Sequence, residues 1–147
     1  MILDEYYMRI ALKEAKLALD KGEIPVGAIV VCNDTIVAKA HNQTEQLNDF
    51  TAHAEMLALS SASEYLSNKY LNQCTLYVTL EPCMMCAGAT YWTQIGKIVY
   101  GASDIKRGFS NFTPSPTHPK VQIVSGILAN ECASLLTDFF SRERAGK

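Results

Sequence analysis

Hydrophobic and charged positions in the first twenty residues alternate with the period of an amphipathic helix. The apolar positions at helical spacing are Tyr7, Ala11, Ala15 and Ala18. Gly22 is a typical residue just after a helix, and Pro25 prevents the helix from resuming. The pattern therefore predicts a first helix that ends near Lys21.

The next segment has the pattern of a β-hairpin. Residues 26–32 are mostly β-branched or small and apolar, Asn33 and Asp34 supply a turn, and residues 35–40 return with further strand-forming residues. Residues 41–50 are polar and lack periodicity, so we expect a loop there.

The second half alternates predicted helices and strands. Thr51 is a good helix cap and precedes a helix-favouring segment that extends beyond Tyr65. Pro82 precedes a second predicted helix, which begins at Cys83 and ends at about Thr93. We expect strands over 75–79, 98–100 and 121–124, and an irregular surface loop over 109–120. A closing helix has its apolar positions at Ile127, Leu128, Leu135, Leu136, Phe139 and Phe140. This alternation predicts an α/β domain with helices on both faces of one sheet, whose strand order stays open.

Length and composition are those of one soluble globular domain spanning residues 1–147. The net charge of −2 excludes a global basic footprint, so any RNA contact must be local. Charged residues interrupt the first twenty positions, so we expect no membrane association and a cytoplasmic protein. In that reducing compartment Cys32, Cys74 and Cys132 should be plain buried thiols.

Four residues in two short stretches form a candidate catalytic zinc site: His53, Glu55, Cys83 and Cys86. One histidine and two cysteines can supply three ligands to Zn²⁺ and leave the fourth tetrahedral position to water. Glu55 could then move the protons of that water. His53 and Glu55 should lie in one first helical turn, and Cys83 at the start of another should have a lowered pKa. The alternatives are a structural zinc site or a histidine of the core.

The same residues carry a family resemblance over nearly the whole chain. His-x-Glu followed by Pro-Cys-x-x-Cys is the signature of zinc-dependent cytidine and adenosine deaminases. With the stretches 25–28, 51–55, 76–89, 126–129 and 138–140, the chain resembles the bacterial tRNA-specific adenosine deaminases. The resemblance implies a cytidine-deaminase-like three-layer α/β/α sandwich with a five-stranded mixed sheet. It also implies a Zn²⁺ cofactor and a homodimer in which the partner completes each site.

The implied reaction is hydrolytic deamination of adenosine to inosine at the wobble position in a tRNA anticodon loop, with Glu55 as the proton shuttle. A free nucleobase or nucleoside deaminase acting on guanine or cytosine is the enzymatic alternative, and Tyr91-Trp92 resembles the pair found in bacterial guanine deaminases. The non-enzymatic alternative is a zinc-stabilised binding module without turnover, in which Glu55 would have no function.

Further residues match family positions or suit RNA contact. Asn42 matches the asparagine that contacts the base, and Asp104 the position that touches the sugar beside the flipped base; a turn residue and a solvated acid are the alternatives. Glu81 should cap the helix that Cys83 begins, or orient a ligand.

Other side chains leave two interpretations open. An apolar stripe on the Cys83 helix should be core or dimer interface, with a substrate platform as the alternative; it contains Met84, Met85, Tyr91 and Trp92. Five cations are ordinary solvated side chains by default, yet local RNA binding would have to use them: Lys106, Arg107, Arg142, Arg144 and Lys147. Phe109 and Phe112 would stack on bases or pack onto the body. The 109–120 segment is shorter than its counterpart in the tRNA enzymes. This difference concerns the surface that would bind RNA and not the catalytic centre.

Overall fold

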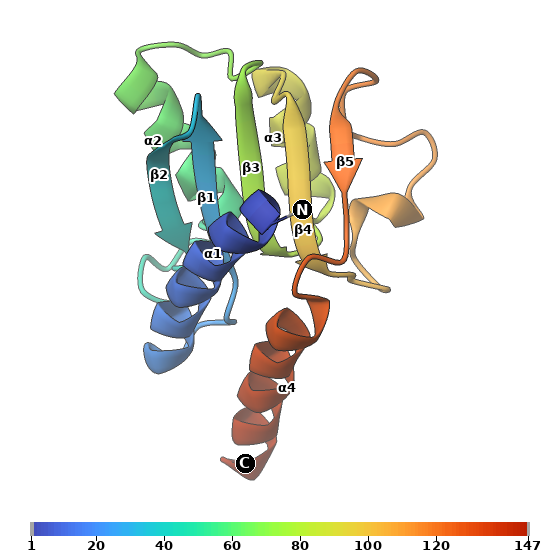
Figure 1. Ribbon diagram of the computed structural model, residues 1–147. Coiled ribbons are helices and arrows are strands. Elements are labelled where there is room, and N and C mark those ends of the chain that lie inside the picture. The colour runs from blue at the N-terminus through green and yellow to red at the C-terminus, as the bar shows by residue number, and fades with distance from the viewer. Residues whose placement is uncertain (1, 147) are drawn as a thin grey trace.

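The computed structural model describes residues 2–146, so Lys147 lies outside the described residues. In chain order the elements are α1 (Ile2–Asp20), β1 (Gly27–Cys32), β2 (Thr35–His41), α2 (Ala54–Leu66), β3 (Cys74–Leu80), α3 (Met84–Thr93), β4 (Lys97–Ala102), a short 3₁₀ helix (Phe109–Asn111), β5 (Gln122–Val124) and α4 (Ala129–Ala145). Their arrangement is shown in Figure 1.

The five strands form one mixed sheet, as the resemblance implied, and the structure gives their order as β2-β1-β3-β4-β5. β1 is antiparallel to both β2 and β3, whereas β3 pairs parallel with β4 and β4 with β5. Four strands therefore point the same way and only β1 is reversed. The carboxyl ends of β2, β3 and β4 consequently lie at one edge of the sheet, which we call the carboxyl edge.

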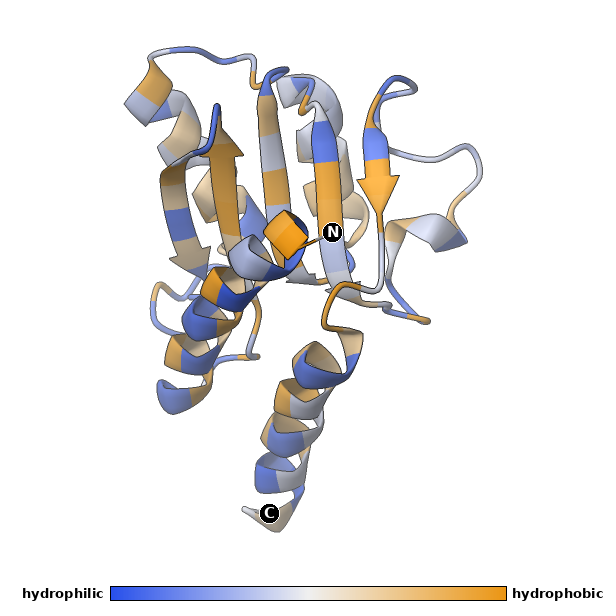
Figure 2. Cartoon of the chain, viewed as in Figure 1, coloured by the Kyte–Doolittle hydropathy of each residue, from blue (hydrophilic) through white to orange (hydrophobic). Residues whose placement is uncertain are grey.

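Helices cover both faces of the sheet, and the three-layer prediction is confirmed (Figure 1). On one face Val30 of β1 packs in a cluster with Ala58 of α2 and Ala87 of α3. On the other face Ile29 packs in a cluster with Met8 of α1 and Cys132 of α4. Adjacent residues of β1 thus enter opposite cores, as the alternation of side chains along a strand requires. Figure 2 shows mainly hydrophobic central strands, whereas α1 carries both kinds of residue.

Local signals located most element boundaries. Gly22, two residues after the end of α1, has φ of +77°. Asn33 and Asp34 have φ of 50° and 63°, as expected for the two central residues of a tight hairpin turn. The closing helix begins only at Ala129, so the expectation that Ile127 and Leu128 belong to it was wrong.

The loop over 109–120 is irregular as predicted, apart from its 3₁₀ turn. Phe109 is 4% exposed and its ring lies edge-on to Tyr100, with ring centroids 5.9 Å apart. Phe109 therefore packs onto the body and is not available to stack on a base; Phe112 remains partly exposed.

Two further expectations concern exposure. Cys74 and Cys132 are buried as predicted, but Cys32 is partly exposed. Met84 and Trp92 are 57% and 76% exposed, so the apolar stripe of α3 is not core in the single chain. Among the described residues, no helix is long and apolar enough to cross a membrane.

Candidate active site

The residues singled out in the sequence gather at the carboxyl edge of the sheet. Asn42 directly follows β2, Cys83 follows β3 and Asp104 follows β4. Because these strands point the same way, the segments after them meet outside one edge, where open α/β sheets hold their ligands. β1 runs the other way and places no residue of the set there.

The helices α2 and α3 each begin at a potential metal ligand. His53 is the N-cap of α2 in an extended conformation, and Cys83 is the N-cap of α3. The expectation that Thr51 caps this helix was wrong. Thr51 lies three residues before the first residue of α2, and its hydroxyl donates to Asp49 Oδ1 at 2.7 Å. Instead, Asn42 Oδ1 accepts the N–H of Ala54 at 2.8 Å. The His53 side chain makes no capping bond and faces α3.

The donor atoms of His53, Cys83 and Cys86 lie within 4.8 Å of one another. His53 Nδ1 is 3.7 Å from Cys83 Sγ and 3.4 Å from Cys86 Sγ. Zinc bonds of ordinary length at a tetrahedral angle would separate nitrogen and sulfur by about 3.6 Å. The three atoms are therefore arranged as a zinc ion needs them, and the donor set suits that metal.

Charge at these sulfurs is unevenly distributed. A hydrogen bond from Cys86 is the main reason that the pKa of Cys83 is lowered to about 3, and His53 contributes in the same direction. The pKa of Cys86 is raised, because it is that donor and because it is buried. The pKa of His53 is raised, first by its hydrogen bond to Cys83. The lowered pKa predicted for Cys83 is confirmed, with the neighbouring thiol as its first cause.

Glu55 lies in the first turn of α2 with 4% of its surface exposed. Burial raises its pKa to about 7, and the nearby charge of His53 opposes that rise. A carboxyl group with such a pKa is suited to both accepting and donating a proton near neutral pH. The acid thus stands beside the candidate metal ligands, as the sequence predicted.

The geometry of the site can be set against known proteins. The sequence model of the cytidine and deoxycytidylate deaminase zinc-binding region matches residues 1–102, which include His53, Glu55, Cys83 and Cys86. The chain belongs to this deaminase family. Its cofactor is accordingly zinc.

Members of the family with full-length similarity include two curated relatives. The chain is 44% identical to the tRNA-specific adenosine deaminase of Bacillus subtilis (strain 168), over 100% of this chain and 94% of the relative. It is 45% identical to the tRNA-specific adenosine deaminase of Aquifex aeolicus (strain VF5), over 95% of each chain.

A solved structure agrees with these sequence similarities. It comes from biochemical and structural studies of A-to-I editing by tRNA:A34 deaminases at the wobble position of transfer RNA. It superposes on this deaminase-family chain with a TM-score of 0.84 at 38% identity, covering 89% of this chain and 99% of that one. The architecture of the family is therefore present.

Glu81 holds the loop beside the site and does not cap α3, so the capping prediction was wrong. Its buried carboxylate accepts the N–H of Asp104 at 3.0 Å, and the N–H and hydroxyl of Ser110 at 2.9 and 2.7 Å. A Cβ at Gly108 would collide with this carboxylate, and Gly108 forms a β-bridge with Cys83. Glu81 thus ties the loop after β4 to the start of α3.

Glu23 has a similar role on the other flank and was missed in the sequence. It is 1% exposed, and its carboxylate accepts the hydroxyl of Thr44 and the N–H groups of Glu45 and Gln46 at 3.2, 3.1 and 2.8 Å. It anchors the loop that follows Asn42. No local pattern distinguishes it from a solvated acid, because its partners lie more than twenty positions away.

We predict that Glu81→Ala releases the 104–110 loop. Two backbone N–H groups would lose a charged acceptor, which should lower the free energy of unfolding by about 2–3 kcal/mol. Urea denaturation would measure this loss, and hydrogen exchange should become faster at Asp104 and Ser110. Glu64→Ala, on the exposed side of α2, is the matched control. Equal stability of the two variants would contradict the anchoring role.

Proposed function

We propose that this protein is a zinc-dependent hydrolase that deaminates adenosine to inosine at the wobble position of a tRNA anticodon loop. The observation that carries the proposal is the close grouping of three metal donors with the buried carboxyl of Glu55. A site that only stabilised the fold would have no use for that acid. The tRNA assignment is supported by the names of relatives that match over nearly their full length.

In this proposal His53, Cys83 and Cys86 hold the zinc ion. Zinc in such a site lowers the pKa of a coordinated water toward neutrality and so supplies the nucleophile. The chain contributes one neutral donor and two thiols, one of which is already strongly acidic. Cys86, whose side chain is fully buried, must lose its proton when the metal binds.

Glu55 performs the proton transfers. Its carboxylate accepts a proton from the attacking water and delivers it to a ring nitrogen of the adenine. Glu55 then assists protonation of the amino group that leaves C6 as ammonia. Burial of Glu55 favours this cycle, because the raised pKa makes the protonated form accessible near neutral pH.

Substrate contacts are assigned to the two flanks of the site. Asn42 uses Oδ1 on Ala54, which leaves its amide N–H groups to donate to the base. Asp104 uses Oδ1 to accept the N–H groups of Lys106 and Arg107 at 3.2 and 3.0 Å. We assign its other oxygen to a ribose hydroxyl of the RNA. The side chains of Lys106 and Arg107 are exposed and supply local positive charge for phosphates.

The protein is proposed to act in the cytoplasm as a homodimer. The exposed side chains of Met84, Tyr91 and Trp92 on α3 form an apolar surface suited to contact with a second copy. Equilibrium sedimentation would test the dimer.

The substrate is tested with an anticodon stem-loop that carries adenosine at the wobble position. We expect inosine in that RNA, and no ammonia release from free guanine, cytosine, adenosine or cytidine under the same conditions. The flanking loop nucleotides should be required, because Asp104 and the cations of its loop are assigned to the ribose and the phosphates beside the reacting base. Ammonia from guanine with unmodified RNA would reject the tRNA assignment in favour of a free-base deaminase.

The roles of Glu55 and Cys86 separate in a pair of variants. Glu55→Gln should retain zinc and lose turnover by about 10²- to 10⁴-fold, because the proton shuttle is removed while all three donors remain. Cys86→Ser should lose most of its zinc, with some loss of stability. Metal analysis measures the zinc content of both variants, and single-turnover assays measure their rates of deamination. Full activity of Glu55→Gln would overturn the mechanism.

Asn42→Asp tests recognition of the base. The new carboxylate can still accept the N–H of Ala54 but has no amide N–H to donate. We expect kcat/KM to fall by about 10- to 100-fold, with unchanged zinc content. Asn72→Asp, exposed at the opposite edge of the sheet, is the control. Equal kcat/KM for the two variants would remove Asn42 from the substrate site.

A further inference from the structure

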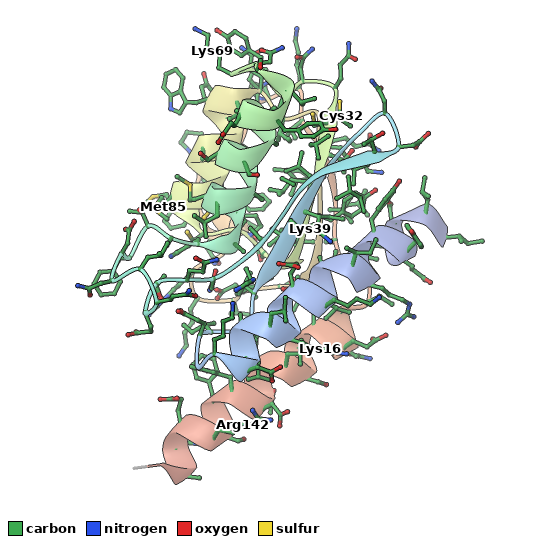
Figure 3. The ribbon with its side chains drawn as sticks, turned by 90° about the vertical axis from the view of Figure 1, so that its left-hand side faces the viewer. Lys16, Cys32, Lys39, Lys69, Met85 and Arg142 are labelled. Atoms are coloured by element: carbon green, nitrogen blue, oxygen red, sulfur yellow. The ribbon has the colours of Figure 1, made fainter. Side chains whose placement is uncertain are left out.

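A second pair of cysteines lies at the edge of the sheet opposite the candidate active site. Cys32 is the last residue of β1 and Cys74 is the first residue of β3. Since these strands are antiparallel, both residues lie away from the carboxyl edge. Figure 3 shows Cys32 toward the end of the molecule where Lys69 lies, apart from Met85 in the first turn of α3.

The register of the two strands sets Cys32 directly opposite Cys74. The N–H of Cys74 donates to Leu71 and its carbonyl accepts the N–H of Gly96, so Cys32 and Cys74 do not exchange the two backbone bonds of a hydrogen-bonded pair. A directly opposed pair of this kind has Cα atoms about 4.5 Å apart. Disulfides span Cα separations of about 4.4–6.8 Å, so the backbone permits a bond without rearrangement.

Both side chains point to the same face of the sheet. Cys74 belongs to the core cluster that contains Val30 and Leu76, and Cys32 packs against that cluster. Val30 precedes Cys32 by two positions, and Leu76 follows Cys74 by two, as the two-residue period of strands demands. The thiols are therefore neighbours above the sheet.

The pair is accessible from one side. Cys32 and Cys74 line a cavity of about 300 Å³ whose other walls come mainly from the segment between α2 and β3. Cys32 is partly exposed, whereas Cys74 is only 3% exposed. Burial first, and then the interaction with Cys32, raise the pKa of Cys74 to about 12. A small oxidant entering the cavity thus meets Cys32 first, with Cys74 behind it as a protonated thiol.

We propose that Cys32 and Cys74 form a redox-active dithiol that hydrogen peroxide converts into an intrachain disulfide. The Cys32 thiolate attacks one peroxide oxygen, the O–O bond breaks, and a sulfenic acid and one water form once a proton is taken up. The Cys74 sulfur then displaces the sulfenic hydroxyl, which leaves with a proton as a second water. Two thiols and one peroxide give one disulfide and two waters, so the cysteines lose the two electrons that the peroxide gains.

In a reducing compartment such a disulfide is a transient species. The bond would close a covalent loop over residues 32–74, which contains β2 and α2 together with Asn42, His53 and Glu55. Oxidation of Cys32 and Cys74 would leave the sulfurs of Cys83 and Cys86 at the candidate metal site unchanged.

The test uses the zinc-loaded full chain treated with hydrogen peroxide, alkylation of the remaining thiols and peptide mapping by mass spectrometry. We expect a linked Cys32–Cys74 peptide pair that dithiothreitol reverses, formed at least about tenfold faster than oxidation of the buried, unpaired Cys132. Cys74→Ser should stop the reaction at a Cys32 sulfenic acid that dimedone traps. Cys32→Ser should leave Cys74 reduced.

Cys132→Ser is the matched control and should form the linked pair at the wild-type rate. The proposal would be overturned if Cys32 and Cys74 stayed reduced after peroxide treatment and were therefore both alkylated. A Cys32 disulfide between two chains would also overturn it, and so would a Cys83–Cys86 disulfide with zinc release before any Cys32–Cys74 link forms. The measurement reads covalent structure and needs no substrate, so its outcome is independent of the tRNA assignment.

Discussion

The approach of His53 Nδ1 to two cysteine sulfurs, at 3.4 and 3.7 Å, is the contact on which the proposed chemistry depends. The histidine and the cysteines belong to different helices and are separated by about thirty positions in sequence. They meet because β2 and β3 point the same way, with β1 reversed between them, so that both following segments emerge at one edge. A ligand set drawn from two helix starts therefore depends on the sheet.

Buried carboxylates keep the surroundings of this contact in place. Glu23 and Glu81 are almost fully buried, yet each accepts three hydrogen bonds from a loop beside the site. Burial of a charged carboxylate costs free energy unless hydrogen-bond donors satisfy its oxygens. With such donors present, the carboxylate makes strong charge-assisted hydrogen bonds. Hydrogen bonds to these two carboxylates thus hold the loops after β2 and β4. Asn42 and Asp104 stand on these held loops.

The cysteines show how one residue type acquires different chemistry from its surroundings. Cys83 and Cys86 share a proton next to an imidazole, which favours thiolate and metal binding. Cys32 and Cys74 face each other across two strands beside a cavity, without a histidine in the pair. Cys132 is buried alone against α1 and β4 residues, where burial raises its pKa to about 12 and it acts as a small apolar residue. The same thiol is thus a candidate metal ligand, a proposed redox partner or a small apolar residue of the core.

The amino-acid sequence by itself determined the type of almost every element and predicted the candidate metal donors and the acid beside them. Those features rest on short-range patterns: the helical spacing in residues 2–20, the Asn33-Asp34 turn, and Cys83 and Cys86 one turn apart. Only the tertiary structure decided the strand order, the anchoring roles of Glu23 and Glu81, the burial of Phe109 and the pairing of Cys32 with Cys74. Each of these joins segments distant in sequence, so it depends on strand register and packing, which local periodicity does not encode.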